Sequence, residues 1–116
     1  MATIALTDDH TLLRNGLAAL VTSLGHTVLF EADNGKDFIS KLDKNNLPEL
    51  VLLDINMPEM DGYDTAQWIK TNHYDIKVLA LSMYDNENSI IRMLKCGAKG
   101  YILKDGEPSE LARAIN

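Results

Sequence analysis

The sequence predicts an α/β fold in which a doubly wound sheet of five parallel strands is covered by helices on both faces. Short apolar runs alternate along the chain with segments in which apolar residues recur every three or four positions, the spacing of an amphipathic helix. The apolar runs are continuous rather than alternating with polar residues, as expected for parallel strands buried on both faces. Right-handed crossovers between such strands give a doubly wound sheet.

The first half of the chain supplies two strands and two helices. Residues 3–7 contain the apolar run Ile-Ala-Leu and are expected as the first strand. A helical stripe follows it, formed by Leu13, Leu17, Leu20, Val21 and Leu24. Gly25 is expected to end this helix, because glycine readily adopts the positive φ found after many helices. Residues 27–30 are expected as the second strand, and an Asn-Gly turn at 34–35 leads into a short helix around residues 38–42.

The second half supplies three more strand–helix pairs. Further apolar runs are expected as strands, at residues 50–53, 78–81 and 101–103. Helices are expected to follow them, at about residues 64–72, around residues 90–94 and from residue 111 onward. The acidic run at 85–87 is expected to open the second of these helices, and Gly97 to end it. The sequence stops barely two turns into the last helix, which is therefore expected to be truncated.

Length and composition are those of one ordinary globular domain covering residues 1–116. Eleven basic and seventeen acidic residues give a net charge of −6, which argues against direct contact with a nucleic-acid backbone. A single cysteine, Cys96, excludes an internal disulfide. No apolar run approaches the roughly 20 residues that span a bilayer, and the N-terminus lacks the basic region of a signal peptide. A cytoplasmic location without a membrane partner is the expectation.

Polar residues follow four of the five predicted strands. They are Asp8 and Asp9 after the first, Asp54 after the third, Ser82 after the fourth and Lys104 after the fifth. Ligands of such sheets bind beyond the carboxyl ends of the strands. Two carboxylates 4 Å apart repel each other by about 4 kcal/mol at an effective dielectric constant of 20, so three of them need a cation. Oxygen ligands without a cysteine or histidine indicate Mg²⁺. His10 is expected near the mouth of the pocket and not at the metal.

A magnesium ion among carboxylates can also hold a phosphoryl group, and Lys104 can neutralise part of its charge. Asp54 is the expected nucleophile, which would form an acyl phosphate. It ends the most apolar strand, and the turn formed by Pro58 and Asp61-Gly62 is expected to leave space above it. Ser82 is placed to hydrogen-bond the phosphoryl oxygens.

The motif Asp-x-x-Met-Pro-x-x-Asp-Gly at residues 54–62, together with the acid pair, Ser82 and Lys104, resembles the receiver domain of bacterial two-component response regulators. The stretches DDHTLLRNGL, LSMY and GAKGYILKD further resemble its NarL/FixJ (LuxR-type) subfamily. The resemblance implies a flavodoxin-like fold and a signalling switch that catalyses only its own Mg²⁺-dependent aspartyl phosphorylation and dephosphorylation. Proteins of this subfamily usually carry a helix-turn-helix DNA-binding domain after the receiver, and whether one follows residue 116 in the parent protein is left open; any DNA contact is expected through that domain and not through residues 1–116.

The resemblance assigns a role to each site residue. Asp54 would accept a phosphoryl group from a sensor histidine kinase. Asp9 and Asp54 would ligate Mg²⁺ directly with the backbone carbonyl of Asn56, and Asp8 would act mostly through a metal-bound water. Asp105 follows Lys104 where many receivers have proline, so the cis or trans state of the bond between them is left open.

The resemblance also implies a conformational switch. Ser82 and Lys104 would bind the phosphoryl oxygens, Ser82 would move toward them, and Tyr101 would turn inward. The face formed by the fourth helix, fifth strand and fifth helix would then change and control an output, with homodimerisation as the family expectation. Phosphorylation would shift a two-state equilibrium by as much as the phosphoryl group prefers one state.

Two other functions and one structural explanation account for parts of the pattern. A phosphatase of the haloacid dehalogenase type also uses an aspartate nucleophile at a strand end, but its motif needs an acid where this chain has Asn56. A flavodoxin-like FMN-binding protein needs a hydroxyl-rich phosphate loop after the first strand, where Asp8 and Asp9 would repel a phosphate. The same two acids could also simply cap the first helix.

Overall fold

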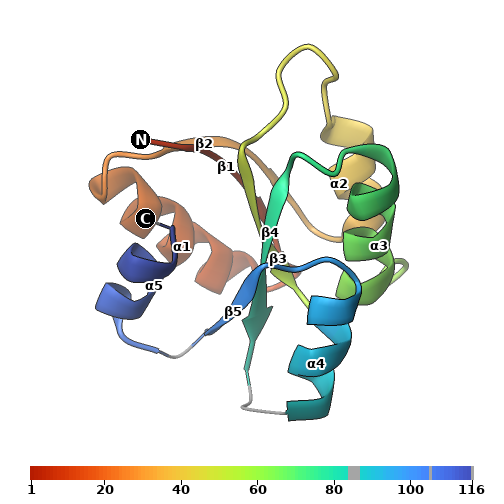
Figure 1. Cartoon of the computed structure of the whole chain (residues 1–116). Coiled ribbons are helices and arrows are strands. Elements are labelled where there is room, and N and C mark those ends of the chain that lie inside the picture. Colours follow the sequence, from red (N-terminus) through yellow and green to blue (C-terminus); the bar gives the residue numbers. More distant parts are fainter. Residues whose placement is uncertain (84–86, 105, 116) are drawn as a thin grey trace.

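The computed structural model describes residues 1–83, 87–104 and 106–115 (Figure 1). In these ranges five strands alternate with five helices. Their order is β1 (Thr3–Thr7), α1 (Thr11–Ser23), β2 (Thr27–Ala32), α2 (Gly35–Lys41), β3 (Leu50–Asp54), α3 (Gly62–Asn72), β4 (Lys77–Ser82), α4 (Glu87–Lys95), β5 (Gly100–Leu103) and α5 (Pro108–Ile115).

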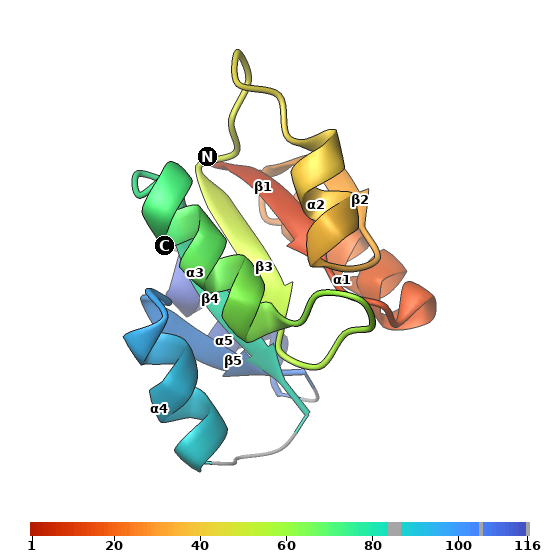
Figure 2. The ribbon, with the colours of Figure 1, turned by 90° about the vertical axis from the view of Figure 1, so that its right-hand side faces the viewer.

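The five strands form one parallel sheet in the order β2-β1-β3-β4-β5. Helices α1 and α5 cover one face of it, and α2, α3 and α4 cover the other (Figures 1 and 2). The predicted doubly wound α/β fold is therefore confirmed. The chain leaves β1 toward β2 at one edge and later continues from β3 toward β5 at the other. The strand order thus reverses between β1 and β3, where a ligand site is expected in such a sheet.

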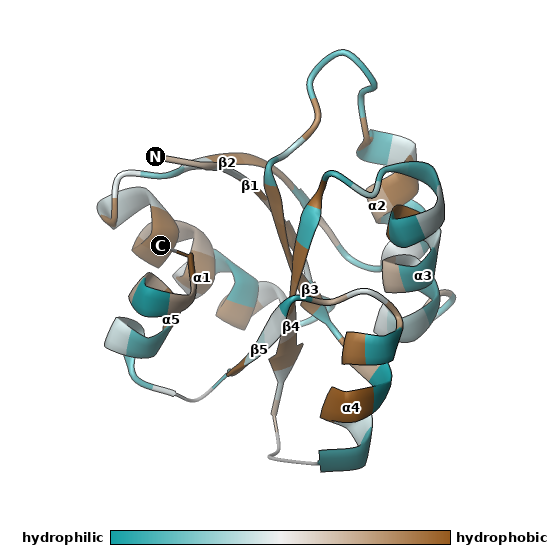
Figure 3. Ribbon diagram, viewed as in Figure 1, coloured by the Kyte–Doolittle hydropathy of each residue, from teal (hydrophilic) through white to brown (hydrophobic). Residues whose placement is uncertain are grey.

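The hydrophobic core lies in two layers, one on each face of the sheet. Successive residues of β1, β3 and β4 point to opposite faces, so each strand contributes to both layers. The layer under α1 and α5 contains Ile4, Leu6, Val21, Leu50, Leu52, Leu79, Leu81, Ile102 and Leu111. The layer under α2, α3 and α4 includes Ala5, Phe38, Val51, Leu53, Ile69, Val78, Ala80 and Met93. Burial on both faces explains the continuous apolar runs, which appear as brown strands in Figure 3.

Some boundaries differ from the expected ones: β2 continues to Ala32, and α5 begins at Pro108 and not at residue 111. Helix α3 begins at Gly62 and not near residue 64, because the Asp61 side chain accepts a hydrogen bond from the Asp64 backbone N–H (2.9 Å). Gly25 and Gly97 adopt the expected positive φ, at 92° and 113°. Helix α4 begins at Glu87, and the rest of the acidic run predicted to open it, residues 85–86, lies outside the described residues.

Candidate functional site

The carboxyl ends of four strands bring the predicted polar residues to one edge of the sheet. Asp8 follows β1, Asp54 ends β3, Ser82 ends β4 and Lys104 follows β5. All four are buried, with exposed fractions of 0% for Asp8, 4% for Asp54, 6% for Ser82 and 9% for Lys104. Charged side chains are rarely buried to this extent unless they are paired or bind an ion. The burial therefore makes this edge the candidate functional site of the molecule.

Lys104 joins the two buried acids. Its Nζ lies 3.0 Å from Asp8 Oδ2 and 3.0 Å from Asp54 Oδ2. Within the described part of the chain, neither of these oxygens accepts a hydrogen bond of acceptable geometry, so both contacts with Lys104 are electrostatic. One lysine therefore faces two carboxylates, and the group keeps an excess of negative charge.

The other oxygen of Asp54 has a fixed partner. Asp54 Oδ1 accepts a hydrogen bond from the backbone N–H of Ile55 (2.8 Å). This bond holds the carboxylate in one orientation, with Oδ2 turned toward Lys104. Burial above all, together with the negative charge of Asp8, raises the pKa of Asp54 to about 6, whereas Lys104 opposes the shift.

Asp9 and His10 complete the acidic cluster. Asp9 is exposed and its Oδ1 lies 3.5 Å from His10 Nδ1. One ligand atom from each of Asp8, Asp9, His10 and Asp54 lies within 4.8 Å of the others. The three carboxylates lie close together, as predicted. His10 was expected only near the mouth of the pocket, but its ring also lies among these carboxylates.

Helix capping does not explain the acid pair. The N-cap residue of α1 is His10, which makes no side-chain capping hydrogen bond, and the first turn of α1 contains no acid. Asp8 Oδ1 accepts a hydrogen bond from the backbone N–H of His10 (2.8 Å), which lies before the helix. Asp8 therefore shapes the loop that carries Asp9 and His10.

A pocket of about 120 Å³ opens beside Asp54 and is lined in part by His10, Asn56, Ser82, Met83 and Lys104. There is thus open space beside Asp54, as predicted from the turn after β3. Tyr101 stands apart from it, on β5, with 46% of its surface exposed. The proposed inward movement of Tyr101 remains a prediction, and the bond between Lys104 and residue 105 lies outside the described residues.

The turn above Asp54 depends on Gly62. The backbone N–H of Gly62 donates to Ile55 O (2.8 Å), which closes the loop between β3 and α3. A Cβ at this position would lie 2.3 Å from Asp54 O and 2.7 Å from Ile55 Cα. Only glycine fits so near this backbone, so the Asp-Gly pair recognised in the sequence has a steric reason.

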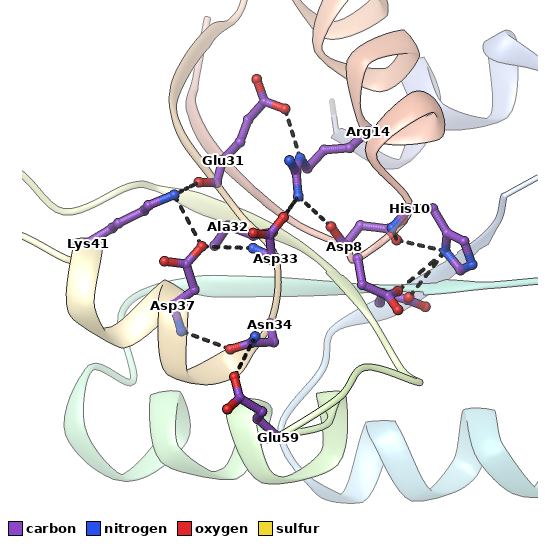
Figure 4. Close-up of polar contacts among 12 residues, drawn as sticks. Asp8, His10, Arg14, Glu31, Ala32, Asp33, Asn34, Asp37, Lys41 and Glu59 are labelled. Carbon is purple, nitrogen blue, oxygen red and sulfur yellow. Dashed lines mark hydrogen bonds and ion pairs between the residues drawn. The ribbon is translucent and has the colours of Figure 1, made fainter.

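Arg14 is a site residue that was not predicted from the sequence (Figure 4). Its Nη1 donates to Asp8 O (2.6 Å), Ala32 O (3.1 Å) and Asp33 Oδ1 (2.7 Å), and its Nε donates to Glu31 Oε1 (3.0 Å). The guanidinium thereby ties the loop after β1 to the end of β2. A basic residue in the first turn of α1, a few positions after the acid pair, is the signal that could have found it.

Fold and site together define a class of protein: a flavodoxin-like α/β domain with an acidic site and a lysine at the carboxyl ends of its strands. The chain belongs to the response regulator receiver domain family, because residues 4–116 match the sequence pattern of that family. This membership favours the receiver interpretation over the phosphatase and flavin-binding alternatives.

None of the helices in the described part of the chain has the length and apolar character needed to cross a bilayer.

Known relatives refine the family assignment to the NarL/LuxR type. The nitrate/nitrite response regulator protein NarL of Escherichia coli K12 is 39% identical over 99% of this chain and 53% of its own length. The chemotaxis protein CheY of Thermotoga maritima is 33% identical over 97% of this chain and 93% of its own length. A LuxR-family DNA-binding response regulator from Staphylococcus aureus has a structure that superposes with a TM-score of 0.90, at 27% identity and with coverage of 100% and 97%. The chain spans about half the length of the NarL relative.

Proposed function

We propose that this domain is the phosphorylation-activated switch of a two-component system, and that Asp54 accepts a phosphoryl group from the phosphohistidine of a sensor histidine kinase. The observation that carries the proposal is the state of Asp54 Oδ2. This oxygen is buried, faces Lys104 Nζ at 3.0 Å and belongs to a side chain that lines an open pocket. It accepts no hydrogen bond from the described residues, so its lone pairs are available for attack.

In the proposed phosphoryl transfer, the two oxygens of the Asp54 carboxylate have different tasks. Asp54 Oδ1 stays hydrogen-bonded to Ile55 N–H while Oδ2 attacks phosphorus. The new O–P bond forms as the P–N bond of the phosphohistidine breaks, and the departing electron pair returns to the donor imidazole. Lys104 and the hydroxyl of Ser82 then bind phosphoryl oxygens, and water later attacks the same phosphorus to release phosphate and restore Asp54.

The residues present fit a divalent cation. Asp8 and Asp54 each place a buried carboxylate oxygen in the site that accepts no hydrogen bond from the described residues, and Asp9 supplies a third carboxylate to the same cluster. Asp9, Asp54 and the carbonyl of Asn56 would hold Mg²⁺ directly, with Asp8 acting through water. Bound Mg²⁺ supplies positive charge to the phosphoryl oxygens.

The output surface is proposed to lie on α4, β5 and α5. Three large apolar side chains are exposed there, Ile91 (41%), Leu94 (44%) and Tyr101 (46%). Movement of Ser82 toward the phosphoryl group, followed by Tyr101, would change this surface and favour homodimerisation. The similarity to NarL-type regulators supports transcription as the output, through a DNA-binding domain outside this sequence, with phosphorylation by a kinase in the cytoplasm.

The phosphoacceptor role is tested by incubating the protein with acetyl phosphate and Mg²⁺ and measuring intact mass. Wild type is expected to gain one alkali-labile phosphoryl group, and Asp54→Asn none. Asp64→Asn is the matched control, because Asp64 is also an aspartate and lies in α3, the helix that follows Asp54 along the chain, but its side chain is exposed. Undiminished labelling of Asp54→Asn would show that another residue is the acceptor. Omission of Mg²⁺ should slow labelling of the wild type, which tests the cation separately.

A further inference from the structure

We propose that His10 is a fourth protein ligand of the metal site and gives it a His10-dependent preference for divalent transition-metal ions over Mg²⁺. The inference rests on the proposed function, because it assumes that a cation binds among Asp8, Asp9 and Asp54. It departs from the sequence-based expectation that His10 has no metal role. It assigns the imidazole a specific task in this chain, namely to supply the one nitrogen donor of an otherwise all-oxygen site.

The position of the ring is the first argument. His10 Nδ1 lies 3.0 Å from Asp8 Oδ1, 3.5 Å from Asp9 Oδ1 and 3.8 Å from Asp54 Oδ2. A single nitrogen thus faces all three carboxylates, and Figure 4 shows the ring turned toward Asp8. Metal–ligand bonds of about 2.1 Å bring ligand atoms to within roughly 4 Å of one another. One candidate atom from each of Asp8, Asp9, His10 and Asp54 lies within 4.8 Å of the others, which is close to the spacing of ligands around a single ion.

The hydrogen-bonding capacity of Nδ1 is the second argument. Nδ1 lies 3.0 Å from the acceptor Asp8 Oδ1 and 3.0 Å from the donor Lys104 Nζ. One ring nitrogen either carries a proton or offers a lone pair, so it can satisfy only one of these neighbours. With a lone pair on Nδ1, the nitrogen and Asp8 Oδ1 are two donors of electron density facing each other. A divalent cation bound to Nδ1 satisfies both, because a water on the cation can donate a hydrogen bond to Asp8 Oδ1.

The buried oxygens are an independent observation that the cluster is built for a ligand. Asp8 and Asp54 are 0% and 4% exposed, and their Oδ2 atoms accept no hydrogen bond from the described residues. Lys104 balances only one of the charges. An ordinary surface group of acids has no reason to bury oxygens in this way, because desolvated carboxylates are costly unless an ion compensates them.

The chemistry of the donor set determines which ions should respond to His10. Imidazole nitrogen suits Zn²⁺, Co²⁺ and Ni²⁺, whereas Mg²⁺ prefers oxygen and keeps several waters. His10 is half exposed, with 56% of its side chain accessible, so the ring can turn away when Mg²⁺ binds through oxygen alone. Removal of His10 should therefore affect transition-metal ions far more than Mg²⁺.

The test titrates the whole chain with CoCl₂ or MgCl₂ in separate calorimetric experiments. His10→Ala and His10→Gln are expected to weaken Co²⁺ binding about tenfold or more and to change Mg²⁺ binding by less than about threefold. Proton NMR of the Co²⁺-loaded wild type should show a strongly shifted imidazole N–H resonance that both variants lack. His73→Ala, at the C-terminus of α3, is the matched control and should leave both affinities and the resonance unchanged.

The outcomes separate this inference from the proposed function. Equal changes in Co²⁺ and Mg²⁺ affinity, no change in either, or retention of the shifted resonance in the His10 variants would overturn the assignment of His10. The proposed function would stand if Mg²⁺ still bound and Asp54 were still phosphorylated. A wild-type protein that binds neither ion and gains no phosphoryl group would instead remove the metal site and both proposals with it.

Discussion

The two ends of the same sheet differ in whether their charged side chains are exposed or buried. At the amino end the charged residues Glu49, Asp75 and Lys77 are all exposed. The backbone there is paired across neighbouring segments, since Lys77 N–H donates to Glu49 O (3.1 Å) and Glu49 N–H donates to Thr3 O (2.9 Å). At the carboxyl end Asp8, Asp54 and Lys104 are buried. Strands β1, β3 and β4 contribute to both ends, so the fold itself does not require buried charge.

The difference indicates that the carboxyl end is organised for chemistry at a cost in stability. Buried carboxylates without full compensation destabilise the folded state, whereas exposed charges contribute little in either direction. The structure limits this cost with Lys104 and with the hydrogen bond from Ile55 N–H to Asp54. Arg14 fixes the loop by donating to the backbone carbonyl of Asp8. Substitutions at the carboxyl end should therefore have larger effects than similar substitutions elsewhere.

The largest effect is expected from Gly62→Ala at the turn that follows β3. A Cβ there would lie 2.3 Å from Asp54 O, and backbone atoms cannot yield as a flexible side chain can. We expect the free energy of unfolding to fall by about 3 kcal/mol or more, as for severe overpacking. Urea denaturation followed by circular dichroism would measure it, with Asp54 phosphorylation falling because the acceptor strand is displaced.

Gly16→Ala is the matched control, away from this turn. Gly16 is exposed in the middle of α1, and an added Cβ would meet no atom of the described residues within 4 Å. Alanine favours a helix over glycine, so this variant should be stabilised by about 0.5–1 kcal/mol. Equal responses of the two glycines would contradict the view that the turn above Asp54 is sterically fixed.

The fold and most of the site could be predicted from the sequence because both follow from periodicity and strand order. Continuous apolar runs located the strands, and the polar residue after each run gave Asp54, Ser82 and Lys104 as convergent. The position of Arg14 after the acid pair was a usable signal, but its hydrogen-bond partners and the direction of the His10 ring could not be predicted. They depend on how far α1 is rotated about its axis and on side-chain rotamers, which packing against the sheet determines. The positive φ of Glu59, 65°, was also not predicted, because the backbone conformation of this residue depends on how the loop packs.

A smaller effect is expected from Arg14→Ala, which removes the cation between the loops after β1 and β2. Only 12% of the Arg14 side chain is exposed, and it donates to two carbonyls and two carboxylates. We expect a loss of about 2 kcal/mol in the free energy of unfolding, in the range of hydrogen bonds to charged groups. Lys77→Ala at the amino end should change it by less than about 0.5 kcal/mol. Similar losses in both variants would remove the contrast between the two ends.

The pH dependence of stability sharpens the comparison at Asp54 itself. Its pKa is about 6 in the folded protein, against roughly 4 for an ordinary aspartate. At a pH between these two pKa values, Asp54 is therefore largely protonated in the folded state and largely deprotonated in the unfolded state. Unfolding releases this proton, so the contribution of Asp54 to the free energy of unfolding falls as pH rises from about 4 to 6. The penalty is fully present above about pH 6 and absent below about pH 4.

Asp54→Asn removes this titration and should isolate it. Without divalent ions, the variant should match the wild type near pH 4 and exceed it by about 1–3 kcal/mol near pH 7.5, since a shift of about two pKa units corresponds to about 3 kcal/mol. Glu49→Gln, at the exposed amino end, should show no such gain. Saturating Mg²⁺ should narrow the difference at pH 7.5, because a bound cation stabilises the carboxylate of the wild type more than the amide of the variant. A difference between Asp54→Asn and wild type that is constant from about pH 4 to 7.5 would mean that the buried carboxylate is already compensated within the chain, and that the carboxyl end carries no more strain than the amino end.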